Sequence, residues 1–216
     1  MRAKERDKDA AMRIREGIES GRLMPNERLV EAEISAWLGT NRANVRMALS
    51  RLEQEGLVVS EPNRGARVRR ISESEAIEIT QVRIALEGLV AREAALRATK
   101  SDIEKLQEIA DAMRAAYTSG DLFGYSQLNG KFHSEIRRIS AHQTAARILS
   151  SLNSHIVRLQ FRVFTLPGRI AESLAEHERI ITALADRQPD RAEAAMRQHL
   201  DQVANGLRAA AAFVNA

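Results

Sequence analysis

Hydrophobic residues recur every three or four positions along most of the chain, a spacing that is typical of amphipathic helices. In the first third this pattern predicts helices at 10–21, 31–39 and 42–56, each closed by a glycine. Two valine-containing runs, at 57–60 and 66–71, flank a polar turn and predict a β-hairpin. Two short helices joined by a glycine-containing turn and followed by a hairpin predict a winged helix-turn-helix.

The helical spacing continues beyond residue 71, where it predicts an antiparallel bundle of about six helices with short loops. The first predicted helix carries its large apolar residues on one stripe, formed by Ile79, Val82, Leu86, Leu89 and Leu96. Capping signals at Ser72, Ser101 and Pro189 mark helix starts. The predicted fold class is therefore mainly α. We expect a winged helix-turn-helix domain at 1–70, a linker at 71–75 and an all-helical domain at 76–213.

Composition narrows the classes of protein that fit. The chain has no cysteine, which excludes disulfides and thiolate metal sites and fits a reducing cytoplasm. No apolar run is long enough to span a membrane, so we expect a cytoplasmic protein without a membrane partner. Residues 1–70 hold 15 Lys and Arg against 11 Asp and Glu. A local excess of basic residues is expected where a protein neutralises a phosphate backbone.

The start of the predicted helix at 42–56 carries side chains suited to base recognition. Arg42 and Arg46 lie one helical turn apart, beside Asn41 and Asn44. An arginine fork can donate two hydrogen bonds to guanine, and asparagine can form two with adenine. The alternatives are that Asn41 only caps the helix and that both arginines are solvated. In the predicted hairpin, Arg64 and Gly65 form either a DNA-contacting wing or an ordinary turn.

The N-terminal segment resembles the GntR-type bacterial transcription regulators over about fifty residues. The resemblance is carried by IREGIESGRLMPNERL, a helix ending in LG, NRANVRMAL, LEQEGLV and a wing with RG before a valine. It implies double-stranded DNA as the partner. Departures from the family's usual residues at 41, 43, 44 and 47 affect the bases that are recognised more than DNA binding itself. The predicted DNA-binding residues are Arg28, Asn41, Arg42, Asn44, Arg46, Arg64 and Gly65.

All five histidines lie in the second predicted domain, and His133, His177 and His199 lie on or beside its apolar stripes. A neutral imidazole is a common metal ligand, and three on facing helices could converge. Three hydrogen-bonded core histidines are the alternative. His142 and His155 fit no pattern of a site.

The second domain resembles the all-helical FCD domain of the FadR-like GntR subgroup. The motifs are VRIALEGLVAREAA, NGKFHSEI, AEHERIITAL and AAMRQHL. The resemblance implies a divalent ion, zinc, nickel or manganese, bound by Asn129, His133, His177 and His199. Asn129 stands where metal-binding members have aspartate. The resemblance also implies a small carboxylate effector, for which Arg83 is a candidate partner. The alternative for Arg83 is a surface salt bridge with Glu87, four residues further on.

The predicted function is therefore a sequence-specific, DNA-binding transcriptional regulator, a repressor whose operator affinity is altered by a small organic acid. We expect a homodimer on a pseudo-palindromic operator. One alternative is a DNA-binding dimer whose bundle binds neither metal nor effector. Another is a metal-dependent lyase or hydrolase with Glu176 or Glu178 as base. We do not expect an enzyme, because adjacent helical positions point apart and catalysis has no use for the basic N-terminal module.

Overall fold

The computed structural model describes the backbone of residues 2–61 and 65–214, and the side chains of residues 10–60, 65–156 and 159–210. The chain divides into two compact units. One unit comprises Met1–Ser72 with Asn153–Arg158, and the other comprises Glu73–Leu152 with Leu159–Ala216. No helix among the described residues combines the length and hydropathy that a membrane span requires.

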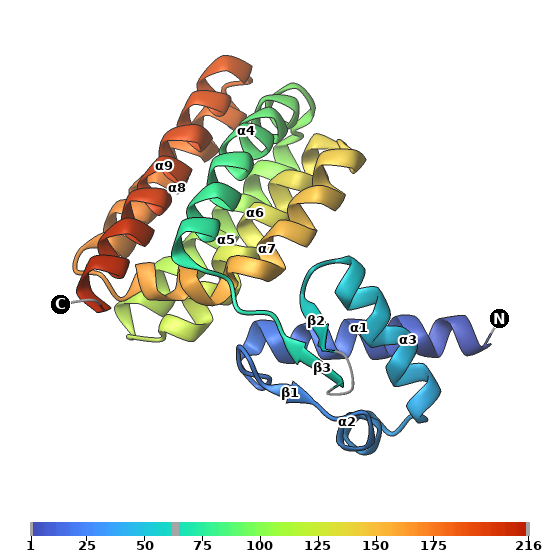
Figure 1. Ribbon diagram of the computed structural model, residues 1–216. Coiled ribbons are helices and arrows are strands. Elements are labelled where there is room, and N and C mark those ends of the chain that lie inside the picture. Colours follow the sequence, from blue (N-terminus) through green and yellow to red (C-terminus); the bar gives the residue numbers. More distant parts are fainter. Residues whose placement is uncertain (1, 62–64, 215–216) are drawn as a thin grey trace. The chain divides into compact units, whose positions relative to one another are not determined.

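The N-terminal unit is a winged helix-turn-helix, as the sequence pattern predicts (Figure 1). Its elements are α1 (Arg2–Ser20), β1 (Arg28–Leu29), α2 (Glu31–Leu38), α3 (Arg42–Gln54), β2 (Val58–Glu61) and β3 (Gly65–Val68). The strands form an antiparallel sheet in the order β1-β3-β2. The pattern did not predict β1, because a two-residue strand within a turn segment carries no periodicity.

The turn between α2 and α3 sets the direction of α3. Gly39 ends α2 in the left-handed conformation, at φ 64°, which glycine adopts without a Cβ clash. From there α3 presents Val45, Ala48 and Leu52 to a core in which all three are fully buried. Because these residues recur at helical spacing, the opposite face of α3 is left to polar side chains.

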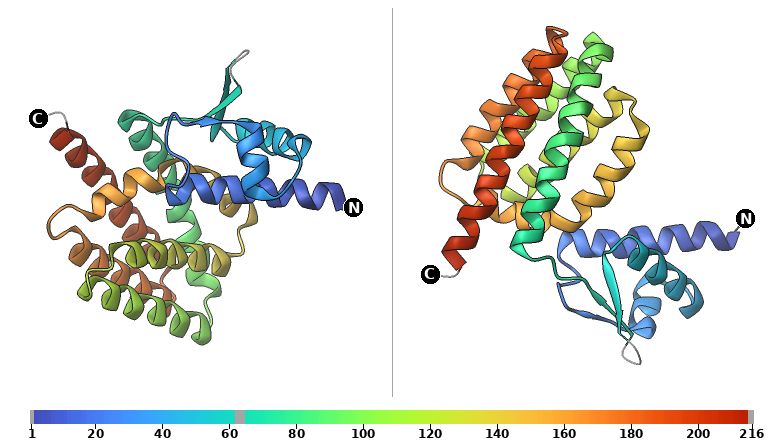
Figure 2. Two further views of the ribbon diagram at one scale, coloured as in Figure 1. Left: turned by 90° about the horizontal axis from the view of Figure 1, so that it is seen from below. Right: turned by 45° about the horizontal axis from the view of Figure 1, so that its top comes forward.

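The C-terminal unit is an all-α bundle, which confirms the second part of the predicted fold class. Its helices among the described residues are α4 (Glu73–Arg97), α5 (Lys100–Thr118), α6 (Leu122–Ser140), α7 (Gln143–Phe164), α8 (Arg169–Ala185) and α9 (Pro189–Val214). Helix α4 packs against α6, α8 and α9, and α5 packs against α6 and α8 (Figure 2). Helix α4 is therefore the element of this unit that contacts α6, α8 and α9 alike.

The large apolar stripe of α4 does not lie on its buried face. Val82 and Leu96 are 50% and 54% exposed, and Leu89 is only half-buried. The buried face is instead formed by Ala76, Thr80, Arg83, Glu87, Gly88, Val90, Ala91, Ala94 and Ala95. Small residues there allow α9 to approach α4 closely, since an added Cβ at Gly88 would lie 3.0 Å from Arg197. The helix is thus apolar on one side and carries buried polar groups on the other.

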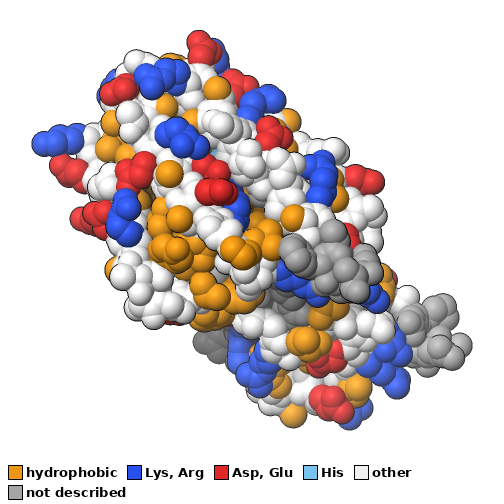
Figure 3. Space-filling view, turned by 90° about the vertical axis from the view of Figure 1, so that its left-hand side faces the viewer, with side chains coloured by type: hydrophobic (Ala, Val, Ile, Leu, Met, Phe, Trp, Pro, Cys, Tyr) orange, Lys and Arg blue, Asp and Glu red, His pale blue; other side chains and the backbone are white. Residues whose placement is uncertain are grey.

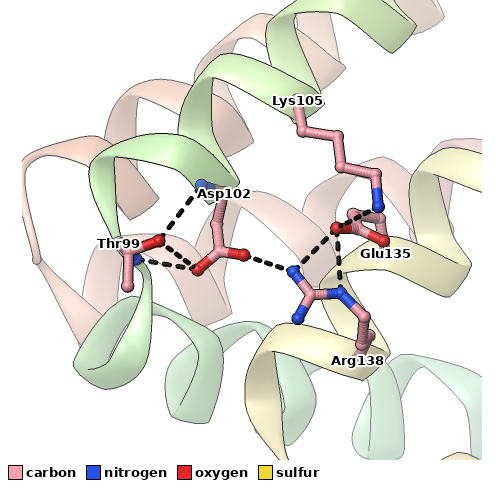
Figure 4. Close-up of polar contacts among 5 residues, drawn as sticks. All are labelled: Thr99, Asp102, Lys105, Glu135 and Arg138. Carbon is pink, nitrogen blue, oxygen red and sulfur yellow. Dashed lines mark hydrogen bonds and ion pairs between the residues drawn. The ribbon is translucent and has the colours of Figure 1, made fainter.

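A surface network joins the start of α5 to α6 (Figure 4). Thr99 and Asp102 form a capping box: the Asp102 amide donates to Thr99 Oγ1 at 3.2 Å, and the Thr99 amide donates to Asp102 Oδ2 at 2.9 Å. The Thr99 hydrogen bonds lower the pKa of Asp102 to about 2, so this carboxylate is ionised and also pairs with Arg138. The predicted cap at Ser101 is therefore wrong by two residues, because a serine two positions into the helix cannot reach the first amides.

Replacing Thr99 with alanine is expected to lower the free energy of unfolding by about 1 kcal/mol, the usual cost of a lost N-cap. Replacing Ser101 with alanine, on the exposed surface of the same helix, is expected to change it by less than about 0.5 kcal/mol. Urea unfolding followed by circular dichroism measures both variants. Equal effects of the two substitutions would contradict the assignment of the cap to Thr99.

Candidate functional site

Arg46 on α3 is held in place by a carboxylate of α2. Its Nε donates to Glu31 Oε1 at 3.0 Å and its Nη2 donates to Glu31 Oε2 at 2.9 Å, so the pair is bidentate. These hydrogen bonds lower the pKa of Glu31. The Arg46 side chain is nevertheless 72% exposed. Arg46 is therefore an accessible cation with a fixed orientation, whose Nη1 group is not used by Glu31.

The two asparagines of the recognition helix are engaged within the protein. Asn41 caps α3 and accepts a hydrogen bond from the Asn44 amide at 2.9 Å. The Asn44 side chain donates to Thr40 Oγ1, also at 2.9 Å. The capping alternative for Asn41 is thus present in the structure. If the side-chain amides of Asn41 and Asn44 contacted bases, these contacts would compete with their internal hydrogen bonds. Arg42, by contrast, is exposed at the first position of α3.

The remaining predicted DNA-binding residues lie around the sheet. Arg28 is exposed on β1, and its Cα partner in the sheet is Arg67 of β3. Gly65 begins β3 at φ 79°, a left-handed conformation that favours glycine and ends the wing turn. Arg64 lies outside the described residues.

Three buried histidines converge inside the C-terminal unit. His133 of α6, His177 of α8 and His199 of α9 are 4%, 0% and 2% exposed. Each offers a nitrogen, and these atoms lie within 4.8 Å of one another. Two nitrogens bound to one tetrahedral zinc ion lie about 3.4 Å apart, given a Zn–N distance of about 2.1 Å. Small side-chain movements would therefore suffice for the three to share an ion.

The nitrogens of His177 are the strongest indication of a ligand. Both are buried, and neither has a hydrogen-bond partner among the described residues. Burial also lowers the pKa of His177 well below its ordinary value, so the ring is neutral and has a free lone pair. Asn129 Oδ1 is likewise buried without a partner in the part of the chain described, one turn before His133. Buried polar atoms are rarely left unpaired, so this donor set fits a bound cation.

A small cavity of about 20 Å³ adjoins these residues, and Asn129, His133 and His199 line it. Arg83 and Arg169 also face the cavity. The Arg83 Nε and Nη1 atoms and the Arg169 Nε atom are buried without partners in the described part of the chain. The cavity therefore combines imidazole nitrogens with unused guanidinium donors.

Glu176 connects Arg169 to the histidine cluster. It accepts two hydrogen bonds from Arg169, at 3.1 and 2.7 Å, and lies 2.6 Å from His199 Nδ1. Burial raises the pKa of Glu176, but His199 and Arg169 lower it by more, so the carboxylate is ionised. Since an ionised carboxylate can only accept, His199 Nδ1 carries the proton. Burial lowers the pKa of His199 to about 4, which leaves its Nε2 with a free lone pair at neutral pH.

Glu87 of α4 occupies a matching position beside His133. Its Oε2 lies 3.5 Å from His133 Nδ1, and its Oε1 accepts from Arg83 at 3.2 Å and Arg137 at 3.3 Å. The Arg83–Glu87 salt bridge predicted as an alternative is thus real, but its side chains are buried at 3% and 0% exposure and are not on the surface.

The sequence pattern missed both glutamates as members of the site. Glu176 was considered only as a catalytic base beside His177, yet it contacts His199 of another helix. Glu87 was considered only as the partner of Arg83. Both glutamates lie on the buried faces of their helices, α8 and α4, and this position is the signal by which they could have been recognised as site residues. Because Glu176 is already bonded to Arg169 and His199, it is not free to act as a general base.

An arginine-bearing recognition helix and a second unit with a buried polar cluster together define the class of ligand-responsive, DNA-binding transcriptional regulators. The family model "Bacterial regulatory proteins, gntR family" matches residues 7–68, and the FCD domain model matches residues 78–202. The chain belongs to the gntR family of bacterial regulators and carries an FCD domain.

Named relatives agree with this family, and a solved structure shares the fold. The chain is 30% identical to the HTH-type transcriptional repressor RspR of Escherichia coli (strain K12), over 86% of this chain and 82% of that protein. It is 29% identical to a probable D-xylose utilization operon transcriptional repressor of Paenarthrobacter nicotinovorans, over 85% and 80% of the two chains. The structure of E. coli McbR/YncC is similar in fold, with a TM-score of 0.81 at 20% identity over 91% of this chain and 94% of that one.

Proposed function

We propose that this regulator is a repressor whose operator affinity changes when a small organic acid binds in the C-terminal unit. The observation that carries the proposal is the set of unused buried donors at one cavity, on Arg83 and Arg169. Around it, the arginines Arg83, Arg137 and Arg169 outnumber Glu87 and Glu176 by one positive charge, which favours an anion. The names of RspR and the probable xylose-operon regulator support repression.

A divalent metal ion held by His133, His177 and His199, with Asn129 as an oxygen donor, completes the proposed effector site. When bound, the ion supplies a Lewis acid for a carboxylate oxygen. Zinc or nickel fits this set better than manganese, because imidazole suits the former and carboxylate oxygen suits the latter. The cavity has room for about one water-sized group. Binding of a larger acid therefore requires movement of lining side chains such as Gln160 and Phe164 of α7.

An effector changes DNA affinity only if it binds one conformation of the regulator better than another. We propose that widening of the cavity favours a conformation with altered operator affinity. A coupling of 1–3 kcal/mol, typical of allosteric proteins, corresponds to a change in affinity of roughly five- to 150-fold.

We further propose a homodimer that binds a pseudo-palindromic operator through two recognition helices. The outward stripe of α4 supports this, since a long helix with Val82 and Leu96 half exposed leaves apolar surface uncovered. Hydrophobic side chains also gather in a patch on the face of the helical unit displayed in Figure 3. A two-fold interface uses the same surface on both copies, so one apolar helix face suffices.

Replacing Val82 with glutamate is expected to convert the dimer into a monomer at micromolar protein, because charges introduced opposite their own copies repel each other. Folding should be unaffected, since the side chain is 50% exposed in one chain. Light scattering coupled to gel filtration gives the mass. The matched control is Tyr117→Glu on α5, where the ring is 41% exposed; it should remain a dimer. An unchanged mass for Val82→Glu would place the interface elsewhere.

The effector proposal is tested by metal analysis of the purified protein and a thermal-shift screen of organic acids. A ligand that binds the folded state at one hundred times its Kd stabilises it by about 2.7 kcal/mol, which raises the unfolding temperature. We expect bound zinc or nickel and a shift with at least one carboxylic acid, absent with its amide. No shift with any acid, in metal-loaded or metal-free protein, would contradict an acid effector.

A further inference from the structure

Two of the three histidines have a buried carboxylate at the same ring atom. Glu176 Oε2 lies 2.6 Å from His199 Nδ1, and Glu87 Oε2 lies 3.5 Å from His133 Nδ1. The contacts join different helices, α8 to α9 and α4 to α6. Both carboxylates are almost fully buried, at 4% and 0% exposure. Burying a carboxylate is costly, so two at one cluster demand a reason beyond packing.

The proposed metal ligands themselves carry no negative charge. Three neutral imidazoles and the Asn129 amide leave a divalent ion with its full charge. In a buried site that charge needs compensation nearby, because water does not screen it. Glu87 and Glu176 together carry two negative charges and lie directly behind two of the ligands.

Each carboxylate is fixed by arginines on its other side. Glu176 receives both hydrogen bonds of the Arg169 fork, and Glu87 is held by Arg83 and Arg137. These bonds fix the orientation of the carboxylates. A carboxylate that accepts from Nδ1 fixes the ring and directs Nε2 away from itself, toward a metal.

We propose that Glu176 is a positioning residue of the metal site: it orients His199 through Nδ1 and, with Glu87, supplies the negative charge that Asn129 does not. Glu87 acts through its charge, because its Oε2 lies 3.5 Å from His133 Nδ1 without forming a hydrogen bond. The proposal rests on the metal site proposed above. Glu176 has the stronger role, since its contact is a full hydrogen bond. The shortest path of charge compensation runs from Glu176 through His199 to the ion.

The effect of Glu176 on the His199 ring is testable in metal-free protein. Long-range ¹H–¹⁵N correlation spectra distinguish the two tautomers of a histidine ring. We expect His199 to carry its proton on Nδ1 in the wild type, and to lose this preference in Glu176→Ala. An Nε2–H tautomer for His199 in the wild type would overturn the proposal.

The contribution of the Glu176 charge to zinc affinity is tested by competition titration of zinc against a chromophoric chelator. Glu176→Gln keeps an acceptor oxygen but removes the charge, and we expect zinc affinity to fall ten- to a hundredfold, the usual cost of losing such a partner. Glu176→Asp keeps the charge and should recover part of the loss. Glu135→Gln is the matched control. Glu135 is also a buried glutamate, at 8% exposure, but it pairs with Arg138 and Lys105 in the surface network that joins α5 to α6 (Figure 4). It should leave zinc affinity unchanged.

Failure of this inference is distinguishable from failure of the metal site. His177→Ala removes a ligand without touching either glutamate's contacts, so it reports on the site alone. Zinc affinity lost in His177→Ala but within twofold of wild type in Glu176→Gln would overturn the role of Glu176 and leave the site intact. Zinc affinity unchanged in His177→Ala, or absent in the wild type, would overturn both. Circular dichroism melting of each variant confirms that a lost affinity is not a lost fold.

Discussion

Replacing Arg46 with alanine is expected to weaken specific operator binding by about 1–3 kcal/mol, roughly five- to 150-fold. Arg46 is exposed on the recognition helix, and its fork is already oriented by Glu31. A preoriented guanidinium loses little rotamer freedom when it binds a base or a phosphate. Removing it eliminates that contact and leaves the core unaffected, because the side chain is 72% exposed and lies outside the core of the unit.

The measurement is a fluorescence anisotropy titration of an operator fragment selected with the wild type from a random-sequence pool. Arg51→Ala is the matched control, since Arg51 is also an exposed arginine on α3 but pairs with Glu55 at the far end of the helix. It should bind within about threefold of wild type, a difference of less than 1 kcal/mol. Binding by Arg46→Ala that equals the control would contradict the assignment of α3 as the recognition helix.

The double replacement His177→Ala and His199→Ala is expected to abolish both bound metal and the response of DNA binding to an organic acid. Two of three imidazole ligands are lost, and the ion cannot be held by His133 and an amide alone. Operator binding without effector should persist, since the winged helix has its own core. Metal analysis and the anisotropy titration with and without acid report the two effects.

His142→Ala is the control for the histidine replacements. His142 caps α7, where its Nδ1 accepts from the Ala145 amide at 3.2 Å, and it is not part of the cluster. Its replacement should lower stability slightly and leave the acid response unchanged. A double variant that still responds like the wild type would show that the effector binds elsewhere.

Much of the fold was predictable from local patterns. Glycines at helix ends, the spacing of Val45 and Leu52, and the valine runs of the hairpin are short-range signals that tertiary packing reinforces. Helix starts were less certain: the cap at α5 lies at Thr99 because its side chain, unlike that of Ser101, reaches the Asp102 amide. Boundaries depend on single hydrogen bonds that a sequence pattern does not specify.

The buried face of α4 could not be predicted from hydrophobicity. Its large apolar residues lie outward, and Arg83 and Glu87 lie inward, because the interior of this unit contains a polar cluster. The convergence of His133, His177 and His199 followed from a resemblance between sequences. The contact of Glu176 with His199 did not, since it depends on how α8 and α9 pack.

The proposed control of DNA binding by the cavity that His133 and His199 line is tested most directly by one titration. Operator affinity is measured for the intact wild type loaded with zinc, with and without the organic acid that gives the largest thermal shift. We predict that the acid changes the operator Kd at least fivefold in the wild type and leaves that of the double histidine variant unchanged. The same Kd with and without the acid in the wild type would contradict the account.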